Sequence, residues 1–272
     1  MQEQTRYLRN RTLQILQISD THLYEDPAGR LLGLNTQTSL EHTLALTQAS
    51  RWSPDLILAT GDLVHDGSAA GYKRLHERLA ALGIPVYCIA GNHDDSAQLS
   101  VYLNRNTVHT VTNIRLGAWA IEFVDSNRPN SNAGHIRENE LERLRESLGQ
   151  YAEEHVLICL HHQPVPIGSE WLDTMAVDNA AALFEILDRS PRIKGVLWGH
   201  VHQAYEAVRN GVQLLSCPST CIQFLPQSER FGLDSRPPGY RWLQLHPDGR
   251  IDTGIERLDR YSDGLDMDAL GY

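Results

Sequence analysis

Apolar runs of strand length recur along this chain, separated by more polar segments. Within each run the apolar positions are continuous rather than alternating, which is typical of strands that other elements cover on both faces. The runs that we expect to form strands lie at residues 13–18, 56–59, 86–90, 121–124, 156–160 and 196–198.

Segments of helical length lie between several of these runs. Their apolar residues recur at helical spacing, and they span residues 38–50, 72–82, 139–148 and 179–187. The last third of the chain differs, because residues 212–216, 240–245 and 254–258 have the pattern of antiparallel strands with few helices between them. Strands that alternate with helices indicate a layered α/β fold. We therefore expect the fold class α/β, with two packed mixed β-sheets flanked by helices in an αββα sandwich.

Residues 223–238 are rich in Pro, Gly, Ser and charged residues, which is typical of a long exposed loop rather than of a linker between domains. A chain of 272 residues can bury a substantial core as one large domain. We therefore predict a single domain over residues 1–272, in which residues 1–11 and about 259–272 are terminal extensions.

The net charge of −10 argues against a nucleic-acid partner, since surfaces that bind nucleic acid normally carry a basic patch. It does not exclude an anionic substrate, because bound divalent cations would reverse the local field. No run of 18 apolar residues is present, so we expect neither a transmembrane helix nor a membrane partner.

The N-terminus lacks the apolar core of a secretory signal. Two of the four cysteines, Cys88 and Cys159, lie in apolar runs, and none of the four forms a C-x-x-C pair. This pattern favours buried, reduced thiols in a cytoplasmic protein.

Five of the expected strands run directly into short groups of Asp, Asn or His. In open α/β sheets, ligands bind at the carboxyl ends of the strands, so we expect these five groups to converge. In chain order they contain Asp20 and His22, then Asp62, then Asn92 and His93, then His161 and His162, and last His200 and His202.

Each group also has a plain structural interpretation when it is taken alone. The stretch IAGNHDDS at residues 89–96 could start a helix, because Asn and Asp are good N-cap residues. Asp20 could cap a turn, Asp62 could be an ordinary turn residue, and His200 or His202 could be a surface or core histidine.

Taken together, the five groups supply carboxylates, a carboxamide and imidazoles without thiolates. That set of donor atoms suits Mn, Fe, Zn, Co or Ni. It is too large for one tetrahedral ion and fits two ions about 3.5–4 Å apart that share a carboxylate.

The blocks SDTH, GDLVHD, GNHD, HH and GHVH, in this order, resemble the signature blocks of the calcineurin-like metallophosphoesterases. The resemblance spans residues 18–202 and implies a site for two divalent metal ions. In that pattern Asp20, His22 and His202 bind the first metal, Asp62 bridges both metals, and Asn92, His161 and His200 bind the second.

The same resemblance implies catalytic roles for Asn92, His93 and Asp94. His93 is not a ligand in this pattern; it contacts the substrate phosphate and protonates the leaving oxygen as the general acid. Asp94 would orient His93 or tune its charge. The nucleophile would be a hydroxide held between the two metals. The residues expected to contact the substrate are His22, Asn92, His93 and His202.

The remaining histidines receive smaller roles or none. His162 is expected to support the ligands from behind. No role is assigned to His42, His65, His76, His109, His135, His155 and His246.

Two segments resemble a narrower group, the bacterial class III cyclic nucleotide phosphodiesterases. They are SDTHLY at the first block and PSTCIQF at residues 218–224, whereas serine/threonine protein phosphatases usually carry GNHE in place of GNHDD. The resemblance implies hydrolysis of 3′,5′-cyclic AMP to 5′-AMP, with Fe and Mn as the expected metals. PSTCIQF could form a wall of the pocket or a buried strand end.

Other functions stay open at this point. One is a broad phosphodiesterase that acts on glycerophosphodiesters, and another is a metal-free scaffold of the same fold. A scaffold would be free to lose Asp62, Asn92 or His202, and this chain keeps all three. A nuclease conflicts with the acidic composition. The sequence leaves a homodimer and the preference between cyclic AMP and cyclic GMP undecided.

Overall fold

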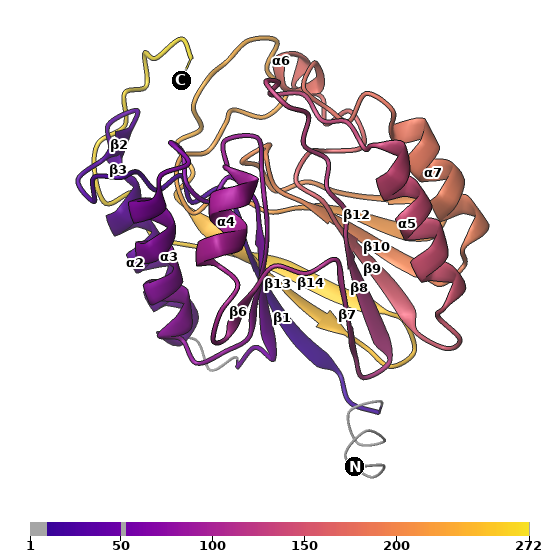
Figure 1. The fold of residues 1–272 in the computed structure, drawn as a ribbon. Coiled ribbons are helices and arrows are strands. Elements are labelled where there is room, and N and C mark those ends of the chain that lie inside the picture. The colour runs from indigo at the N-terminus through magenta and orange to yellow at the C-terminus, as the bar shows by residue number, and fades with distance from the viewer. Residues whose placement is uncertain (1–9, 50–52, 272) are drawn as a thin grey trace.

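Two six-stranded sheets lie face to face at the centre of the protein, and helices cover the outer face of each sheet (Figure 1). The structure is a computed structural model that describes residues 10–49 and 53–271. Most of the predicted N-terminal extension, residues 1–9, and the last residue of the first predicted helix lie outside the described residues.

The first sheet contains the N-terminal strands. Strands β1, β4, β5 and β6 run parallel, β13 pairs antiparallel with β1, and β14 pairs antiparallel with β13. The sheet order is β14 (Ile251–Arg257), β13 (Gly239–Leu245), β1 (Leu13–Ile18), β4 (Leu56–Thr60), β5 (Val86–Ile89) and β6 (Val108–His109).

The second sheet is built in a similar way from the later strands. Strands β8, β9, β10 and β12 run parallel, and β7 and β11 close the two edges antiparallel. The sheet order is β11 (Glu206–Arg209), β12 (Val212–Ser216), β10 (Ile193–Trp198), β9 (His155–Cys159), β8 (Trp119–Phe123) and β7 (Asn113–Leu116).

The alternation of side chains along each strand divides the apolar residues between two layers. In β1, Ile15 packs in the core between the two sheets, whereas Leu16 packs in the core under the helices of the first sheet. Ile121 and Leu157 of the second sheet face Ile15 across the same inner core. Both faces of the central strands are therefore buried, which explains why their sequences read as continuous apolar runs.

The helices pack on the outer faces of the sheets. Buried residues of α2, α3 and α4 belong to the core over the first sheet, and those of α5 and α7 belong to the core over the second. The helices are α2 (Thr36–Ala49), α3 (Ala69–Ala80), α4 (Ser96–Tyr102), α5 (Glu138–Gly149), α6 (Glu170–Asp173) and α7 (Ala180–Arg189).

The predicted fold class, two packed mixed sheets flanked by helices, is confirmed. The expectation of antiparallel strands in the last third is wrong on one side of β12, which pairs in parallel with β10. The pattern also missed the small hairpin β2 (Arg30–Leu31) and β3 (Leu34–Asn35), because two-residue strands carry no periodicity. No helix among the described residues is long and apolar enough to cross a membrane.

Residues 223–238 contain no helix or extended strand, as predicted, but the loop is only partly exposed. Its start at Phe224 and its end at Pro238 are buried, and Phe224 pairs with Leu233 in an isolated β-bridge. The described C-terminal residues lie against the β2–β3 hairpin, where Asp266 N–H donates to Leu32 O (3.0 Å) and Asp263 faces Arg30 (3.5 Å).

Candidate metal centre

The five polar groups predicted from the sequence do converge, at the edge where the parallel strands of both sheets end. Each group lies in the loop directly after its strand: β1, β4 and β5 in the first sheet, and β9 and β10 in the second. The carboxylate and imidazole atoms form overlapping clusters whose members lie within 4.8 Å of one another, and these clusters include Asp20, His22, Asp62, His161, His200 and His202.

Asp20, His22 and His202 form one side of the centre. His22 Nε2 lies 3.2 Å from His202 Nε2, and His202 Nε2 lies 3.5 Å from Asp20 Oδ1. All three side chains are fully buried. Two imidazole nitrogens that face each other at this distance can share one proton at most, so at least one of them presents a lone pair.

Asp62 connects this side of the centre with the other. Its Oδ2 atom lies 3.9 Å from His22 Nε2 and 3.3 Å from His161 Nε2. Asn92 Oδ1 in turn lies 3.2 Å from His161 Nε2. Asp62 is thus placed as a carboxylate between two groups of donor atoms.

His200 completes the second side. It clusters with His161 and His162, and its buried Nε2 atom has no hydrogen-bond partner among the described residues. A buried polar nitrogen without a partner costs free energy, so such an atom needs an explanation.

Backbone carbonyls set the tautomers of two of the histidines. His161 Nδ1 lies 2.8 Å from Thr60 O, and His202 Nδ1 lies 2.9 Å from Ile222 O. A carbonyl oxygen can only accept, so each Nδ1 carries a proton, and in the neutral ring each Nε2 has a lone pair that points into the centre. Metal-binding histidines are typically oriented in this way.

Burial and charge act on the same side chains. Burial lowers the pKa of His22 and of His200 well below the ordinary value, which keeps both imidazoles neutral. At His161 burial acts in the same direction, but the Asp62 carboxylate outweighs it and raises the pKa of His161 to about 9.

The residues fit divalent metal ions. Unprotonated imidazole nitrogens, two carboxylates and a carboxamide oxygen converge, and the orphaned His200 Nε2 would gain the partner that it lacks. Nitrogen and oxygen donors of this kind suit first-row divalent metals.

The family to which these features point is shown by comparison with known proteins. The family described as calcineurin-like phosphoesterase matches residues 13–204. The chain belongs to the calcineurin-like phosphoesterases.

Several relatives within this family match nearly the whole chain. A 3′,5′-cyclic adenosine monophosphate phosphodiesterase, CpdA, of Pseudomonas aeruginosa is 39% identical over 258 residues, 95% of this chain and 94% of that protein. The protein of the same name from Escherichia coli is 38% identical over 90% of both chains.

Solved structures with low sequence identity share the fold. A dimetal phosphatase from Danio rerio has a TM-score of 0.61 at 14% identity and covers 93% of this chain and 100% of its own. GAP50, described as the anchor in the inner membrane complex of Plasmodium, has a TM-score of 0.62 at 15% identity over 93% of this chain and 90% of its own. These two likenesses concern the fold alone.

The backbone at the family's signature residues is unusual. Five of the residues that converge on the centre have positive φ angles between 46° and 63°, a region that non-glycine residues rarely occupy. Such conformations cost free energy and persist only where the surrounding structure enforces them, as at functional sites. The five residues are Asp20, His22, Asp62, His200 and His202.

The glycines of the signature blocks allow the loops to approach each other. A Cβ atom at Gly91 would lie 2.2 Å from Asp62 Oδ1, and one at Gly199 would lie 2.0 Å from Ser19 Oγ. Gly61 has a φ of +95°, and a Cβ there would meet His161 Nδ1 at 2.3 Å. No other amino acid fits at these positions without displacing a residue of the centre.

His93 lies at the mouth of the centre and is half-buried. Its backbone N–H donates to Asp62 Oδ1 (2.9 Å), which ties it to the centre, and its ring stands edge-on to His22 at 5.0 Å. It also stacks on His65, with ring centroids 4.4 Å apart and an interplanar angle of 20°.

His65 received no role from the sequence, yet it lies beside the centre. Its Nδ1 atom is 3.0 Å from His22 Nδ1, and burial lowers its pKa to about 4. The available signal was its position inside GDLVHD, three residues after Asp62.

Asp94 is bonded to the backbone of two signature loops. Its carboxylate accepts hydrogen bonds from the backbone N–H groups of Leu63, Val64 and Gly91 and from the Tyr72 hydroxyl. These bonds hold the GDLVHD and GNHD loops together. Asp94 thereby holds the backbone of the loop that carries His93, and its expected effect on the His93 ring stays a prediction.

The stretch IAGNHDDS contains a helix start as well as candidate site residues. Asn92 and His93 face the centre, and Asp95 Oδ1 accepts from Ala97 N–H and Gln98 N–H as the N-cap of α4.

PSTCIQF forms a buried loop that supports the centre from behind. Ser219 Oγ donates to Asp20 O (2.7 Å), Ile222 O accepts from His202, and Phe224 stacks on the His202 ring at 4.2 Å. The His162 ring lies against the rings of His161 (4.9 Å between centroids) and His200 (4.7 Å), and Ser126 Oγ lies 2.9 Å from its Nδ1 atom.

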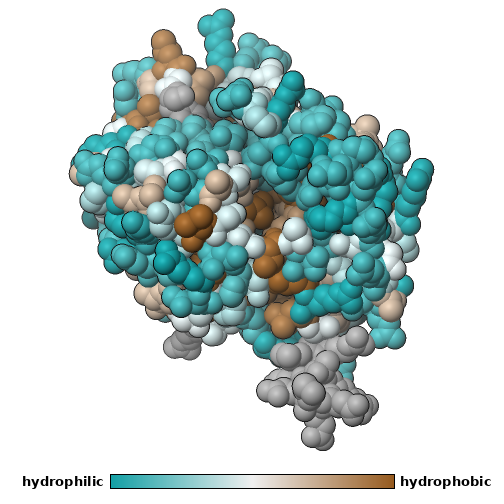
Figure 2. Space-filling view, viewed as in Figure 1, coloured by the Kyte–Doolittle hydropathy of each residue, from teal (hydrophilic) through white to brown (hydrophobic). Residues whose placement is uncertain are grey.

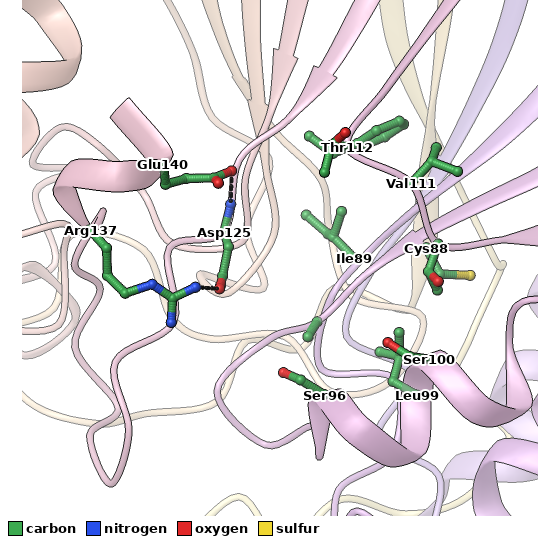
Figure 3. Close-up of a pocket in the computed structure, with 13 residues that line it drawn as sticks. Cys88, Ile89, Ser96, Leu99, Ser100, Val111, Thr112, Asp125, Arg137 and Glu140 are labelled. Carbon is green, nitrogen blue, oxygen red and sulfur yellow. Dashed lines mark hydrogen bonds and ion pairs between the residues drawn. The ribbon is translucent and has the colours of Figure 1, made fainter. Parts of the chain in front are cut away.

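Two cavities flank the GNHD loop. One of about 280 Å³ is lined at one end by Asn92, His93 and His200, so it opens onto the metal centre. The other, of about 330 Å³, lies between the sheets and is lined by Cys88, Ile89 and Phe123 with the Asp125–Arg137 ion pair at one side (Figure 3). It shares no lining residue with the candidate metal ligands.

Proposed function

We propose that the protein hydrolyses 3′,5′-cyclic AMP to 5′-AMP with the help of two divalent metal ions. The observation that carries this proposal is the complete set of donor side chains at one edge of a phosphoesterase fold. The full-length relatives named as cyclic AMP phosphodiesterases support the choice of substrate.

The proposed ligand assignment follows the two sides of the centre. Asp62, between the sides, would be shared. When bound, the metals would polarise the phosphodiester and make a nucleophile available near neutral pH. Fe and Mn are the proposed metals, and Zn, Co or Ni suit the same donors. The first ion would take Asp20, His22 and His202, and the second would take Asn92, His161 and His200.

The side chains of the protein would bind the diester and protonate its leaving oxygen. The carboxamide of Asn92 and the ring of His93 line the cavity that would receive the diester. His93 would donate a ring proton to the departing 3′ oxygen, and its stacking on His65 holds the ring in place for that transfer. His22 and His202 would contact the substrate from the opposite side of the centre.

The proposal has further parts. We infer that residues 1–272 act as one cytoplasmic domain, without a nucleic-acid or membrane partner, and we leave the homodimer as an option for direct measurement.

The competing function is a broad phosphodiesterase for glycerophosphodiesters. A metal-free scaffold is disfavoured, because strained and neutral ligands would serve no purpose in it.

The test compares two diesters in metal-reconstituted protein. 3′,5′-Cyclic AMP has a poor alkoxide leaving group, whereas bis-(p-nitrophenyl) phosphate releases a phenolate that needs little protonation. We expect His93→Ala to slow cyclic AMP hydrolysis about 10²–10⁴-fold and to affect the nitrophenyl ester far less.

Asn92→Ala should lower turnover of both esters by weakening metal binding, and the metal content of the purified variant would report this directly. His42→Ala, at an exposed histidine on α2, is the matched control and should leave both rates unchanged. If the wild-type protein cleaves only the nitrophenyl ester, the assignment of the metal centre stands and the cyclic AMP proposal is excluded. Equal losses on both esters in His93→Ala would contradict the acid role.

A further inference from the structure

The cavity at the metal centre has two chemically different ends. Its polar end is formed by Asn92, His93 and His200, as described above. Its other end is lined by Trp171, Met175 and other apolar side chains. A ligand that fills it must therefore combine an anionic group with a flat or apolar group.

The apolar end is built from segments that are far apart in the sequence. Trp171 belongs to α6, and Phe231 belongs to the middle of the 223–238 loop. Both elements lie above the ends of the parallel strands, at the top of the view in Figure 1. Two exposed residues also line this cavity. They are Asn132 and, from the C-terminal segment, Gly271.

The aromatic rings at this end form a cluster that continues into the metal centre. Trp171 stands edge-to-face on Phe224 (5.0 Å, 79°) and on Phe231 (5.2 Å, 68°). Phe224 is buried and stacks on His202, a proposed ligand, at 4.2 Å. The position of the Trp171 ring is thus coupled through one buried ring to the metal centre.

Trp171 also carries a hydrogen-bond donor without an acceptor. Its buried Nε1 atom has no partner among the described residues. Tryptophan N–H groups usually find a partner when they are buried. Because this atom is buried, an acceptor on a ligand reaches it only when the indole ring turns toward the cavity.

We propose that Trp171, Phe231 and Met175 form the nucleobase subsite and determine the preference for cyclic nucleotides over small diesters. This inference rests on the proposed function. A purine offers a π face for the aromatic rings and acceptor nitrogens for the indole N–H, while its cyclic phosphate reaches Asn92 and His93 at the polar end. Glycerol would leave the aromatic wall unfilled.

The experiment uses two substrates that differ only in the base. These are 3′,5′-cyclic AMP and the methyl riboside 3′,5′-cyclic phosphate, which has the same diester and leaving group but no base. We expect Trp171→Leu and Phe231→Leu each to raise KM for cyclic AMP about tenfold, with kcat little changed, because stacking on an aromatic ring contributes at this level. Neither variant should change the kinetic constants for the abasic substrate.

Two further variants separate the contribution of the aromatic ring from that of the indole N–H and control for the change of side chain. Trp171→Phe keeps a ring but removes the N–H donor, so it should restore most of the affinity that Trp171→Leu loses. Phe184→Leu makes the same change at a partly buried phenylalanine of α7, under Arg209, and should be silent on both substrates.

The outcomes distinguish the subsite from the function. Wild-type turnover of cyclic AMP together with equal KM changes on both substrates, or with none, would overturn the nucleobase subsite and leave the proposed function standing. Wild-type protein that cleaves the abasic diester but not cyclic AMP would overturn the proposed function and, with it, the subsite.

Discussion

At the scale of single residues, the metal centre depends on backbone conformations that most sequences avoid. Asp20 and His22 are separated by Thr21, and both have positive φ angles, whereas Thr21 does not. His200 and His202 also have positive φ angles. This repeated kink turns both side chains of each pair toward the same point. The adjoining glycines then permit the loops to meet, because a Cβ at Gly91 or Gly199 would occupy the position of a neighbouring polar atom.

Gly91→Ala tests this requirement. Its φ angle is not positive, so the substitution acts through space rather than through backbone strain. We expect the new Cβ to displace Asp62, to lower activity by about 100-fold and to destabilise the fold by about 1–3 kcal/mol. Activity, metal content and urea unfolding would be measured together.

Gly149→Ala is the matched control, because a Cβ at this last residue of α5 would have no atom within 4 Å. It should keep full activity and should not destabilise the protein. Full activity and metal content in Gly91→Ala would show that close approach at this glycine is dispensable.

At the scale of elements, one buried charge fixes α5 on the second sheet. Glu122 of β8 is fully buried and pairs with Arg143 of α5 (2.8 Å), while the Tyr151 hydroxyl also donates to it. Arg143 further donates to Phe123 O and pairs with Glu140. The buried carboxylate is thus fully satisfied, and the register of the helix on the strand depends on it.

Arg143→Met should destabilise the protein by about 3–5 kcal/mol, because it leaves Glu122 charged and buried without its partner. The double variant Glu122→Gln/Arg143→Met should recover a large part of that loss, since the uncompensated charge is gone. Urea unfolding midpoints would measure both.

Arg145→Met makes the same change two residues along α5, where Arg145 and Glu138 form an exposed pair. We expect a change within about 0.5 kcal/mol there. Similar losses in Arg143→Met and Arg145→Met would contradict the role of the buried pair.

At the scale of the whole molecule, all four cysteines are buried. Most of the face seen in Figure 2 is hydrophilic, and apolar residues gather at its centre. Cys88 lies in the core between the first sheet and its helices, and Cys159 lies in the core between the two sheets. Cys217 and Cys221 lie in the loop behind the metal centre. Burial raises the pKa of Cys217 and of Cys221 to about 12 and raises those of the other two thiols further.

The native protein should therefore resist thiol reagents at pH 8. The thiolate is the reactive form, and a raised pKa lowers its population at any given pH below that value. We expect none of the four cysteines to react stoichiometrically before unfolding and all four to react in urea. The colour yield of a disulfide exchange reagent would count them.

Cys88 lines the cavity in Figure 3, so any slow native reaction should begin there. Cys88→Ala should remove that phase and leave the count in urea lower by one. Rapid native labelling of Cys217 would contradict the closed packing behind the centre.

The sequence by itself determined the layers and indicated the candidate ligands. Strands such as Leu13–Ile18 are buried on both faces, so their local composition identifies them without knowledge of their partners. The candidate ligands, from Asp20 to His202, lie directly after strands, and the topology brings the carboxyl ends of these strands to one edge of the sheets. Both signals are local, and neither depends on long-range packing.

The tertiary structure alone decided which other side chains reach the centre. Trp171 and Phe231 carry no local signal, and His65 has only its position inside GDLVHD. These side chains reach the centre because loops after different strands fold over the same edge. The role of Asp94 likewise depends on backbone N–H groups about 30 residues earlier in the chain. Contacts of this kind depend on side-chain packing between distant segments, which hydrophobic periodicity does not encode.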